Sequence, residues 1–341
     1  MIGSIRKGPN RRLLIVGTVF LPLLLLVLSL SFGTYAISLK EVLKIILAKV
    51  AGLKPDLLSS PEANIVLNIR LPRLILALLA GAAFSVSGAS LQSLFRNPLV
   101  NEYILGVSFG AGFGAAASLV LLSRTFPPQL LAFACGLLAV VLVLLISEGA
   151  RNTMFAVLLT GIIVSALFQA LLSAIEFVAS PYALQSLFFW LLGSFSQATW
   201  SDLLWSAPLI IAGLGFLLNL GWRLNALSLS DDEARSLGLA VKRERILIIC
   251  LTTLITSAVV AIAGIIGWVG LIVPHAVRGL VGSDNRLVLP LSAGFGASLM
   301  LLADSLIRIF SPYEFPVGIL TNLVGIPFFL YLIKKSRASW S

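Results

Sequence analysis

Few residues of this chain have the types and spacing that chemistry would require. The single histidine, His275, has no cysteine, aspartate or glutamate near it in sequence, so a metal site there would need distant ligands. Asp304 precedes Arg308 by four residues, the spacing of an ion pair on one helix face. No G-x-x-x-x-G-K-[ST] loop is present to bind nucleotide phosphates. We therefore expect no catalytic, cofactor or metal site in this chain, and energy from ATP would need another subunit.

The elements that must carry these residues are membrane helices. Only 11% of the 341 residues are charged, 59% are hydrophobic, and the mean hydropathy is +1.05, whereas soluble domains average about 25% charged residues. A helix needs about 20 apolar residues to cross a bilayer. Nine segments meet this requirement: 13–34, 71–93, 103–122, 128–147, 154–178, 203–221, 245–267, 287–307 and 316–333. We expect an all-α, polytopic membrane protein with a single transmembrane domain over residues 1–341.

The distribution of basic residues predicts an orientation and a tenth span. Basic residues precede the first apolar segment, and Lys334, Lys335 and Arg337 follow the last, so the positive-inside rule places both termini in the cytosol. An even number of crossings is then required, and residues 269–282, interrupted by Pro274, are the best candidate for the missing one. About ten helices in the cell inner or plasma membrane are expected. Six basic residues fall in the first outer loop: Lys40, Lys44, Lys49, Lys54, Arg70 and Arg73.

Two interpretations of this basic outer loop are open. It is either a surface that meets an acidic partner or an interfacial helix over residues 38–51 whose lysines touch lipid headgroups. Ser38 and Glu41 have the spacing of a capping box, and Gly52 follows the predicted helix end.

Charge is concentrated in residues 228–245, between the predicted sixth and seventh spans on the cytosolic side. Ser230 and Glu233 have capping-box spacing, and Leu237-Gly238 ends a helix of about two turns. A second short basic segment follows, so we expect a knob of two short helices. The alternative is an ordinary solvated loop.

Small residues suggest packing and an internal repeat. Gly106, Gly110 and Gly114 are spaced four apart and are expected to share one helix face for close helix packing. An offset of 182 positions places AGFGA at 111–115 on AGFGA at 293–297, and pairs Gly88 with Gly270. Duplicated halves are common in transporters, so a repeat is predicted, with its direction left open.

Long ordered motifs resemble a known family over nearly the whole chain. They are RLPRLILALLAGAAFSVSGASLQSLFRNPLVNEYILGVSFGAGFGA (70–115), LSDDEARSLGLAVKRER (229–245), GWVGLIVPHAVRGLVGSDNRLVLPLSA (267–293), LLADSLIR (301–308) and PVGILTNLVGIPFFLYLI (316–333). The chain resembles the permease subunits of ATP-binding cassette importers for iron-siderophores, haem and cobalamin. The sequence departs from the family at Asn101 and Glu102, where an acidic-Pro pair is frequent.

The resemblance implies partners and roles. It implies a ten-helix subunit in a homodimer or a close heterodimer, two cytosolic ATPases that use ATP and Mg²⁺, and a periplasmic or lipid-anchored binding protein, with no nucleic acid. Residues 228–245 resemble the coupling segment that contacts the ATPase. The residues implied for this contact are Ser230, Asp231, Asp232, Glu233, Arg235, Leu237 and Gly238. Arg70, Arg73 and Arg308 match arginines that bind the binding protein, and Met154 and Phe155 are candidates for a cytosolic gate.

The expected function is the translocation step of an ATP-driven importer, and the chain itself is not expected to be an enzyme. An iron-siderophore-type chelate is the favoured cargo, with cobalamin, haem and molybdate as alternatives. A secondary carrier that works alone is the rival function, although one paired acid is few for a proton relay.

Overall fold

The computed structural model describes residues 11–52, 55–122, 125–149, 153–311, 313 and 315–337. Within these residues every regular element is a helix, which confirms the all-α expectation. In chain order they are α1 (Arg11–Ser29), α2 (Leu39–Ala51), α3 (Pro55–Leu58), α4 (Pro61–Asn64), η1 (Ile65–Arg70), α5 (Leu71–Phe95), η2 (Glu102–Leu105), α6 (Val107–Ala116), η3 (Ala117–Leu121), α7 (Pro128–Gly149), α8 (Met154–Val178), α9 (Pro181–Leu191), α10 (Trp200–Asn219), α11 (Gly221–Leu227), α12 (Asp231–Ser236), α13 (Val241–Ala263), α14 (Val269–Val281), α15 (Asn285–Phe310) and α16 (Val317–Arg337).

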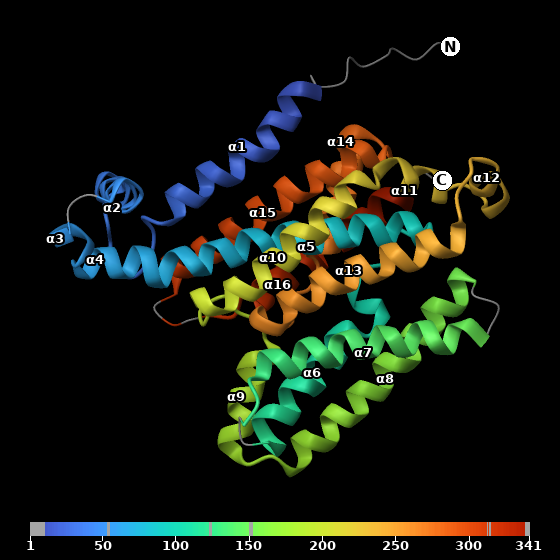
Figure 1. Cartoon of the computed structure of the whole chain (residues 1–341), viewed down its shortest axis with the longest axis horizontal. Coiled ribbons are helices and arrows are strands. Elements are labelled where there is room, and N and C mark those ends of the chain that lie inside the picture. Colours follow the sequence, from blue (N-terminus) through green and yellow to red (C-terminus); the bar gives the residue numbers. More distant parts are fainter. Residues whose placement is uncertain are drawn as a thin grey trace.

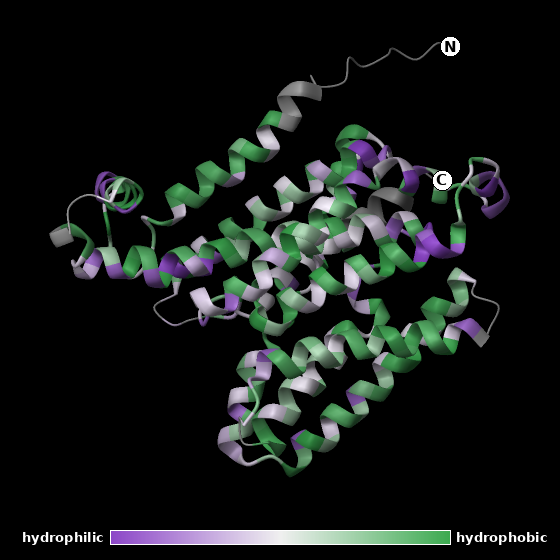
Figure 2. Cartoon of the chain, in the orientation of Figure 1, coloured by the Kyte–Doolittle hydropathy of each residue, from purple (hydrophilic) through white to green (hydrophobic). Residues whose placement is uncertain are grey.

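Within the described residues, six helices are long and apolar enough to cross a membrane. They are Pro61–Phe95, which joins α4, η1 and α5, and Pro128–Glu148, Met154–Val178, Trp200–Asn219, Val241–Ala263 and Asn285–Phe310. Four shorter apolar helices of 10–17 residues accompany them: Val16–Ser29, Val107–Leu121, Val269–Val281 and Val317–Leu330. Figure 2 shows hydrophobic residues along these helices and hydrophilic ones mainly near their ends and in α2 and α12.

Helix α5 is the central element of the bundle. It packs against α10, α13, α14 and α15, and almost all of its residues are buried. Small side chains let the neighbouring backbones approach closely. A Cβ on Gly81 would overlap the backbone of Gly296 in α15, and one on Gly88 would overlap Gly270 in α14. Gly88 and Gly270 are the pair that the 182-residue offset relates; the repeat itself stays a prediction.

The two ends of the bundle carry different elements, as Figure 1 shows. At one end, α12 and the start of α13 lie beside the end of α5 and the end of α7; the Arg96–Asp231 and Lys242–Glu148 ion pairs join these elements. We call this the α12 end. The opposite end carries α2, α3 and α4 and is called the α2 end. Helices α6 to α9 form a group beside the main bundle, to which α13 connects through its packing on α7.

Several local expectations can be compared with the structure. Ser38 caps α2 by accepting a hydrogen bond from the Glu41 amide at 3.3 Å, and Gly52 ends the helix with φ +63°. Helix α14 corresponds to the predicted broken span, with Pro274 inside it. Helix α9 was not expected. Lys54, Arg151 and the side chains of the basic residues at both chain ends lie outside the described residues.

The predicted glycine face of α6 holds only in part. A Cβ on Gly110 would lie 2.6 Å from the Cys135 carbonyl oxygen, and one on Gly114 would overlap the Leu131 backbone, so both face α7. Gly106 differs from them because it precedes α6 with φ +83°, and its neighbours are on α8. A glycine is favoured at this position because the turn from η2 into α6 needs a positive φ, which other residues adopt only with strain.

Candidate functional site

Helix α12 is a short helix with both ends fixed. The Ser230 hydroxyl accepts from the Glu233 amide at 3.3 Å, and the Ser230 amide donates to Glu233 Oε2 at 2.8 Å, which completes the expected capping box. The Ser230 hydroxyl also donates to Glu233 Oε2 at 2.7 Å, and this hydrogen bond together with the one from the Ser230 amide holds the pKa of the Glu233 carboxyl below its usual value. Leu237 closes the helix, and Gly238 follows in the left-handed region with φ +85°. Only one short helix is present: the expected second one is the basic first turn of the long helix α13, because the apolar run that follows continues it into the membrane. We call α12 with its two ends the α12 knob.

Asp231 anchors α12 to the bundle. Its carboxylate accepts from Arg245 Nη2 at 2.6 Å and Nη1 at 3.0 Å, and from Arg96 Nη2 at 3.2 Å. Arg96 also donates to the Leu227 carbonyl at 3.2 Å. Burial raises the pKa of Asp231, but the hydrogen bonds and charges of the two arginines outweigh it and leave the pKa below its usual value. The anchor fixes α12 to the ends of α5 and α13.

The outer surface of α12 is polar with an apolar side chain at its edge. Asp232 and Arg235 form an exposed ion pair at 3.0 Å, while Ala234 is buried against the bundle. Leu237 is 50% exposed. Exposed apolar side chains with a polar rim are typical of protein interfaces. The structure thus brings the predicted coupling residues together on one projecting surface; the contact with an ATPase stays a prediction.

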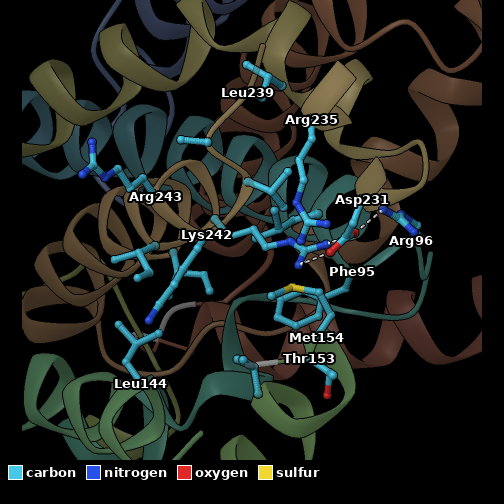
Figure 3. A pocket seen from close by; sticks show the side chains of 17 residues that line it. Phe95, Arg96, Leu144, Thr153, Met154, Asp231, Arg235, Leu239, Lys242 and Arg243 are labelled. Atoms are coloured by element: carbon cyan, nitrogen blue, oxygen red, sulfur yellow. Dashed lines mark hydrogen bonds and ion pairs between the residues drawn. The ribbon is translucent and has the colours of Figure 1, made fainter. Parts of the chain in front are cut away.

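The two candidate gate residues lie at the start of α8 and differ in exposure. Thr153 caps the helix by accepting from the Ala156 amide at 3.2 Å. Met154 is half-buried and lines a cleft of about 880 Å³ beneath α12, as Figure 3 shows, whereas Phe155 is 73% exposed and does not line it. Only Met154 therefore shares a cavity with the α12 segment.

The three predicted docking arginines gather at the α2 end. Arg73 Nε lies 2.7 Å from Asp304 Oδ1, and Arg308 Nε lies 2.9 Å from Asp304 Oδ2. Arg70 donates to the carbonyls of Leu30 and Tyr35. The expected Asp304–Arg308 pair is thus present, and Arg73, which lies 231 positions before Asp304 in sequence, binds the same carboxylate.

Burial gives these arginines a structural role in the described conformation. Arg70 and Arg73 are each 5% exposed. Arg308 also donates to the Ser29 carbonyl at 3.0 Å, so the cluster holds the segment after α1 against α5 and α15. Docking of a binding protein at these residues stays a prediction, and it would have to exchange internal hydrogen bonds for external ones.

Comparison with known proteins identifies the family. The sequence pattern described as the FecCD transport family matches residues 21–335, which is almost the whole chain. The chain belongs to the FecCD transport family. It is 38% identical over 328 residues to the molybdate import system permease protein MolB of Haemophilus influenzae, covering 95% of this chain and 96% of that protein.

Two further comparisons of this FecCD chain are with a hemin permease sequence and with a solved transporter structure. The hemin transport system permease protein HmuU of Yersinia pestis is 38% identical over 282 residues, 80% of this chain and 84% of its own. A solved structure of a metal-chelate type ABC transporter in an inward-facing conformation matches with a TM-score of 0.83 and 35% identity, covering 95% of this chain and 99% of that one. The chain is therefore a membrane permease of the ABC transporter class.

Buried polar residues of this FecCD permease were missed by sequence reasoning. Glu102 in η2 is 1% exposed, and neither of its carboxylate oxygens has a hydrogen-bond partner among the described residues. It lies against Gly270 of α14. Gln92 donates to the Gly270 carbonyl at 3.1 Å and accepts from Arg278. The departure from the family pattern at Glu102 was the only signal in the sequence, and nothing in it indicated that η2 turns back into the bundle.

Proposed function

We propose that this chain is the translocation subunit of an ATP-driven importer. The observation that carries the proposal is the α12 knob of a FecCD permease: a capped helix, anchored through Asp231, that presents a polar surface and the exposed Leu237. A helix held at both ends transmits displacement to the helices that anchor it, whereas a solvated loop would absorb it. The anchoring residues are Arg96, directly after α5, and Arg245, in α13, and both of these helices are mostly buried in the bundle.

The proposed assembly contains the partners expected for this family. A second permease copy, identical or closely related, lines the path, and two cytosolic ATPases bind ATP and Mg²⁺ and contact residues 228–245. The six long apolar helices and the four shorter ones would make the ten spans of this topology. With both termini in the cytosol of a plasma or inner membrane, the α12 end faces the ATPases. The permease itself carries out no reaction.

Binding-protein docking is proposed at the α2 end. Arg70, Arg73 and Arg308 carry three positive charges against the one carboxylate of Asp304, so this region has an excess of positive charge. An acidic surface on a periplasmic or lipid-anchored binding protein would be complementary to it. Because the arginines form hydrogen bonds within the chain, we propose that the binding protein contacts the segment after α1, whose carbonyls accept these bonds, and acts on the arginine cluster through that segment.

The proposed cargo is a metal chelate of the iron-siderophore type. The similarity to a structure of the metal-chelate type supports this class, and the hemin permease HmuU is a relative at comparable identity. Molybdate is the second candidate, because the MolB permease is 38% identical over nearly full length. Uptake of a ferric chelate, cobalamin, hemin and molybdate should be compared in the same reconstituted system.

The coupling proposal is tested by Leu237→Asp, which would bury an unpaired charge in the contact with the ATPase. The matched control is Leu43→Asp on α2, which changes a side chain of similar exposure, 42% against 50%, at the other end. Each variant is reconstituted with the ATPase and the binding protein. We expect Leu237→Asp to lose ATPase co-purification and uptake while its gel-filtration profile stays normal. Normal co-purification and uptake by Leu237→Asp would refute the contact.

A further inference from the structure

Arg278 lies near the end of α14 and holds this helix against α5. Its Nη1 donates to Gln92 Oε1 at 2.5 Å, and its Nη2 donates to the Ser93 hydroxyl at 2.8 Å. The same Nη2 donates to the Ala89 carbonyl at 3.0 Å and lies 3.4 Å from Asn285 Oδ1, at the start of α15. Within the described residues no carboxylate pairs with Arg278. The guanidinium is therefore held by neutral groups of two other helices.

A second contact between α14 and α5 lies deeper in the bundle. Gln92 Nε2 donates to the Gly270 carbonyl at 3.1 Å, and a Cβ on Gly88 would overlap the Gly270 backbone. Gly270 and Arg278 are about two turns, or about 12 Å, apart along the helix. A helix that is bound to its neighbour at two levels moves together with it. Gln92 contacts both levels, because its side-chain oxygen accepts from Arg278.

The hydrogen bonds continue from Arg278 to the α12 knob. The Asn285 amide donates to Asn225 Oδ1 of α11 at 2.8 Å. Helix α11 ends at Leu227, whose carbonyl accepts from Arg96 at 3.2 Å, and Arg96 also pairs with Asp231 of α12. Figure 1 shows α11, α12 and α14 at the same end of the bundle. Helix α14 is therefore connected to the α12 knob through an unbroken series of printed side-chain and backbone contacts.

The opposite end of α14 borders a cavity of about 420 Å³. Trp268, directly before α14, lines this cavity together with Asn101, which precedes η2, and Asn322 of α16. Trp268 has φ +73°, a conformation that a bulky residue adopts only when its surroundings impose it. Its ring packs on Phe329 of α16, with ring centroids 5.5 Å apart. A displacement of α14 would therefore change the shape of this cavity.

The contacts of Arg278 are suited to positioning a helix. Both of its terminal nitrogens are engaged within the chain, so they are not available to a partner protein or to cargo. A guanidinium donates in several fixed directions at once, whereas the ammonium of a lysine is a compact charge on a flexible stem. Arg278 can thus bind α5 and α15 together, and this is the task that its position requires.

We propose that Arg278 is a positioning residue that makes α14 move with the α12 knob, so that displacement of the knob reaches the cavity at the start of α14. This inference rests on the proposed function, because an ATPase must displace the knob. Loosening α14 should separate ATP hydrolysis from transport, while the permease still binds the ATPase.

The test measures the amount of cargo imported per ATP hydrolysed, in proteoliposomes that contain the permease, the ATPase and the binding protein. The cargo is the one that the wild type accumulates among a ferric chelate, hemin, cobalamin and molybdate. Arg278→Gln should lower this ratio at least about fivefold, the lower end of typical coupling between two sites, with normal ATPase co-purification. Arg278→Lys should give an intermediate ratio. Arg286→Gln, which removes an exposed basic residue next to Asn285, is the control and should keep the wild-type ratio.

A second variant interrupts the same connection at α11. Asn225→Ala removes the acceptor of the Asn285 amide at a partly exposed position, so it decides the test if Arg278→Gln yields no folded protein. It should also lower the ratio, and the double variant should be no worse than the more affected single variant, because both changes interrupt one connection. An unchanged ratio in Asn225→Ala and in folded Arg278→Gln, or independent effects that multiply in the double variant, would overturn the inference. Wild-type uptake that needs no ATPase would instead refute the proposed function, which is a separate result.

Discussion

The cluster around Asp304 allows a quantitative prediction. Asp304 is fully buried, and its partners Arg73 and Arg308 have side chains only 7% and 10% exposed. In Asp304→Asn the side chain keeps its size but loses its charge, so two buried guanidinium groups lose the carboxylate that pairs with both of them. Removing one partner of a buried ion pair typically costs about 3–5 kcal/mol, because the remaining charge is left uncompensated. We expect a destabilisation of about this size.

The matched control is Asp284→Asn at the start of α15. Asp284 pairs with Arg286 at 2.9 Å, with side chains 30% and 64% exposed, and it caps the helix, a role that asparagine also fills. Exposed ion pairs contribute about 0–1 kcal/mol, so this variant should be close to wild type.

The assay is thermal unfolding in detergent, followed by the fluorescence of the six tryptophans. Asp304→Asn should unfold at a temperature several degrees below both wild type and Asp284→Asn. Adding Arg308→Gln should recover part of the loss, because one unpaired cation is removed. Equal melting temperatures for the two single variants would refute the argument that the arginine cluster holds the α2 end together.

Three further predictions concern other parts of the bundle. Gly88→Ala should lower the free energy of unfolding by at least ~3 kcal/mol, the upper end of typical overpacking penalties, because the added methyl group would overlap the α14 backbone. Gly279→Ala, whose methyl group would meet open space, is the control, and the folded yield after gel filtration distinguishes the two variants. Glu102→Gln should keep the wild-type melting temperature, because a fully buried carboxyl with no hydrogen-bond partner in the part of the chain that the structure describes is stable only in its neutral form; a large decrease would show that the carboxylate is ionised. Hydrogen bonds from the Ser230 hydroxyl and amide lower the pKa of Glu233, so they stabilise α12 at pH values above the unfolded-state pKa and are lost as pH falls through the folded-state pKa. Amide protection of residues 231–237, corrected for intrinsic exchange, should therefore fall in acid in the wild type and fall less in Glu233→Gln, whose side-chain oxygen accepts the same hydrogen bonds without titrating; an equal fall in both would contradict this.

Local signals in the sequence predicted the elements that depend on local interactions. Hydropathy located the long spans, and the Ser230–Glu233 spacing predicted the capping box that the structure contains. The i,i+4 spacing predicted the Asp304–Arg308 pair. Each of these depends on residues within a few positions of one another, or on an apolar run that a membrane requires.

Features that depend on distant contacts could not be predicted in this way. The path of residues 96–105 back into the bundle places Glu102 against α14, and no periodicity reports such a turn. Arg73 pairs with Asp304 across 231 positions, so its burial was hidden while its charge suggested an outer surface. Gly106 has the spacing of a packing residue but serves a turn, because only the backbone conformation distinguishes the two.

Uptake into proteoliposomes tests the central claim most directly. The permease is reconstituted with its ATPase and binding protein, and accumulation of a ferric chelate is measured with internal or external ATP, without either partner, and with an ionophore. The account predicts accumulation that requires ATP on the α12 side, the ATPase and the binding protein, and that persists when ion gradients are collapsed. Accumulation by the permease alone, driven by an ion gradient and abolished by the ionophore, would contradict it and identify a secondary carrier.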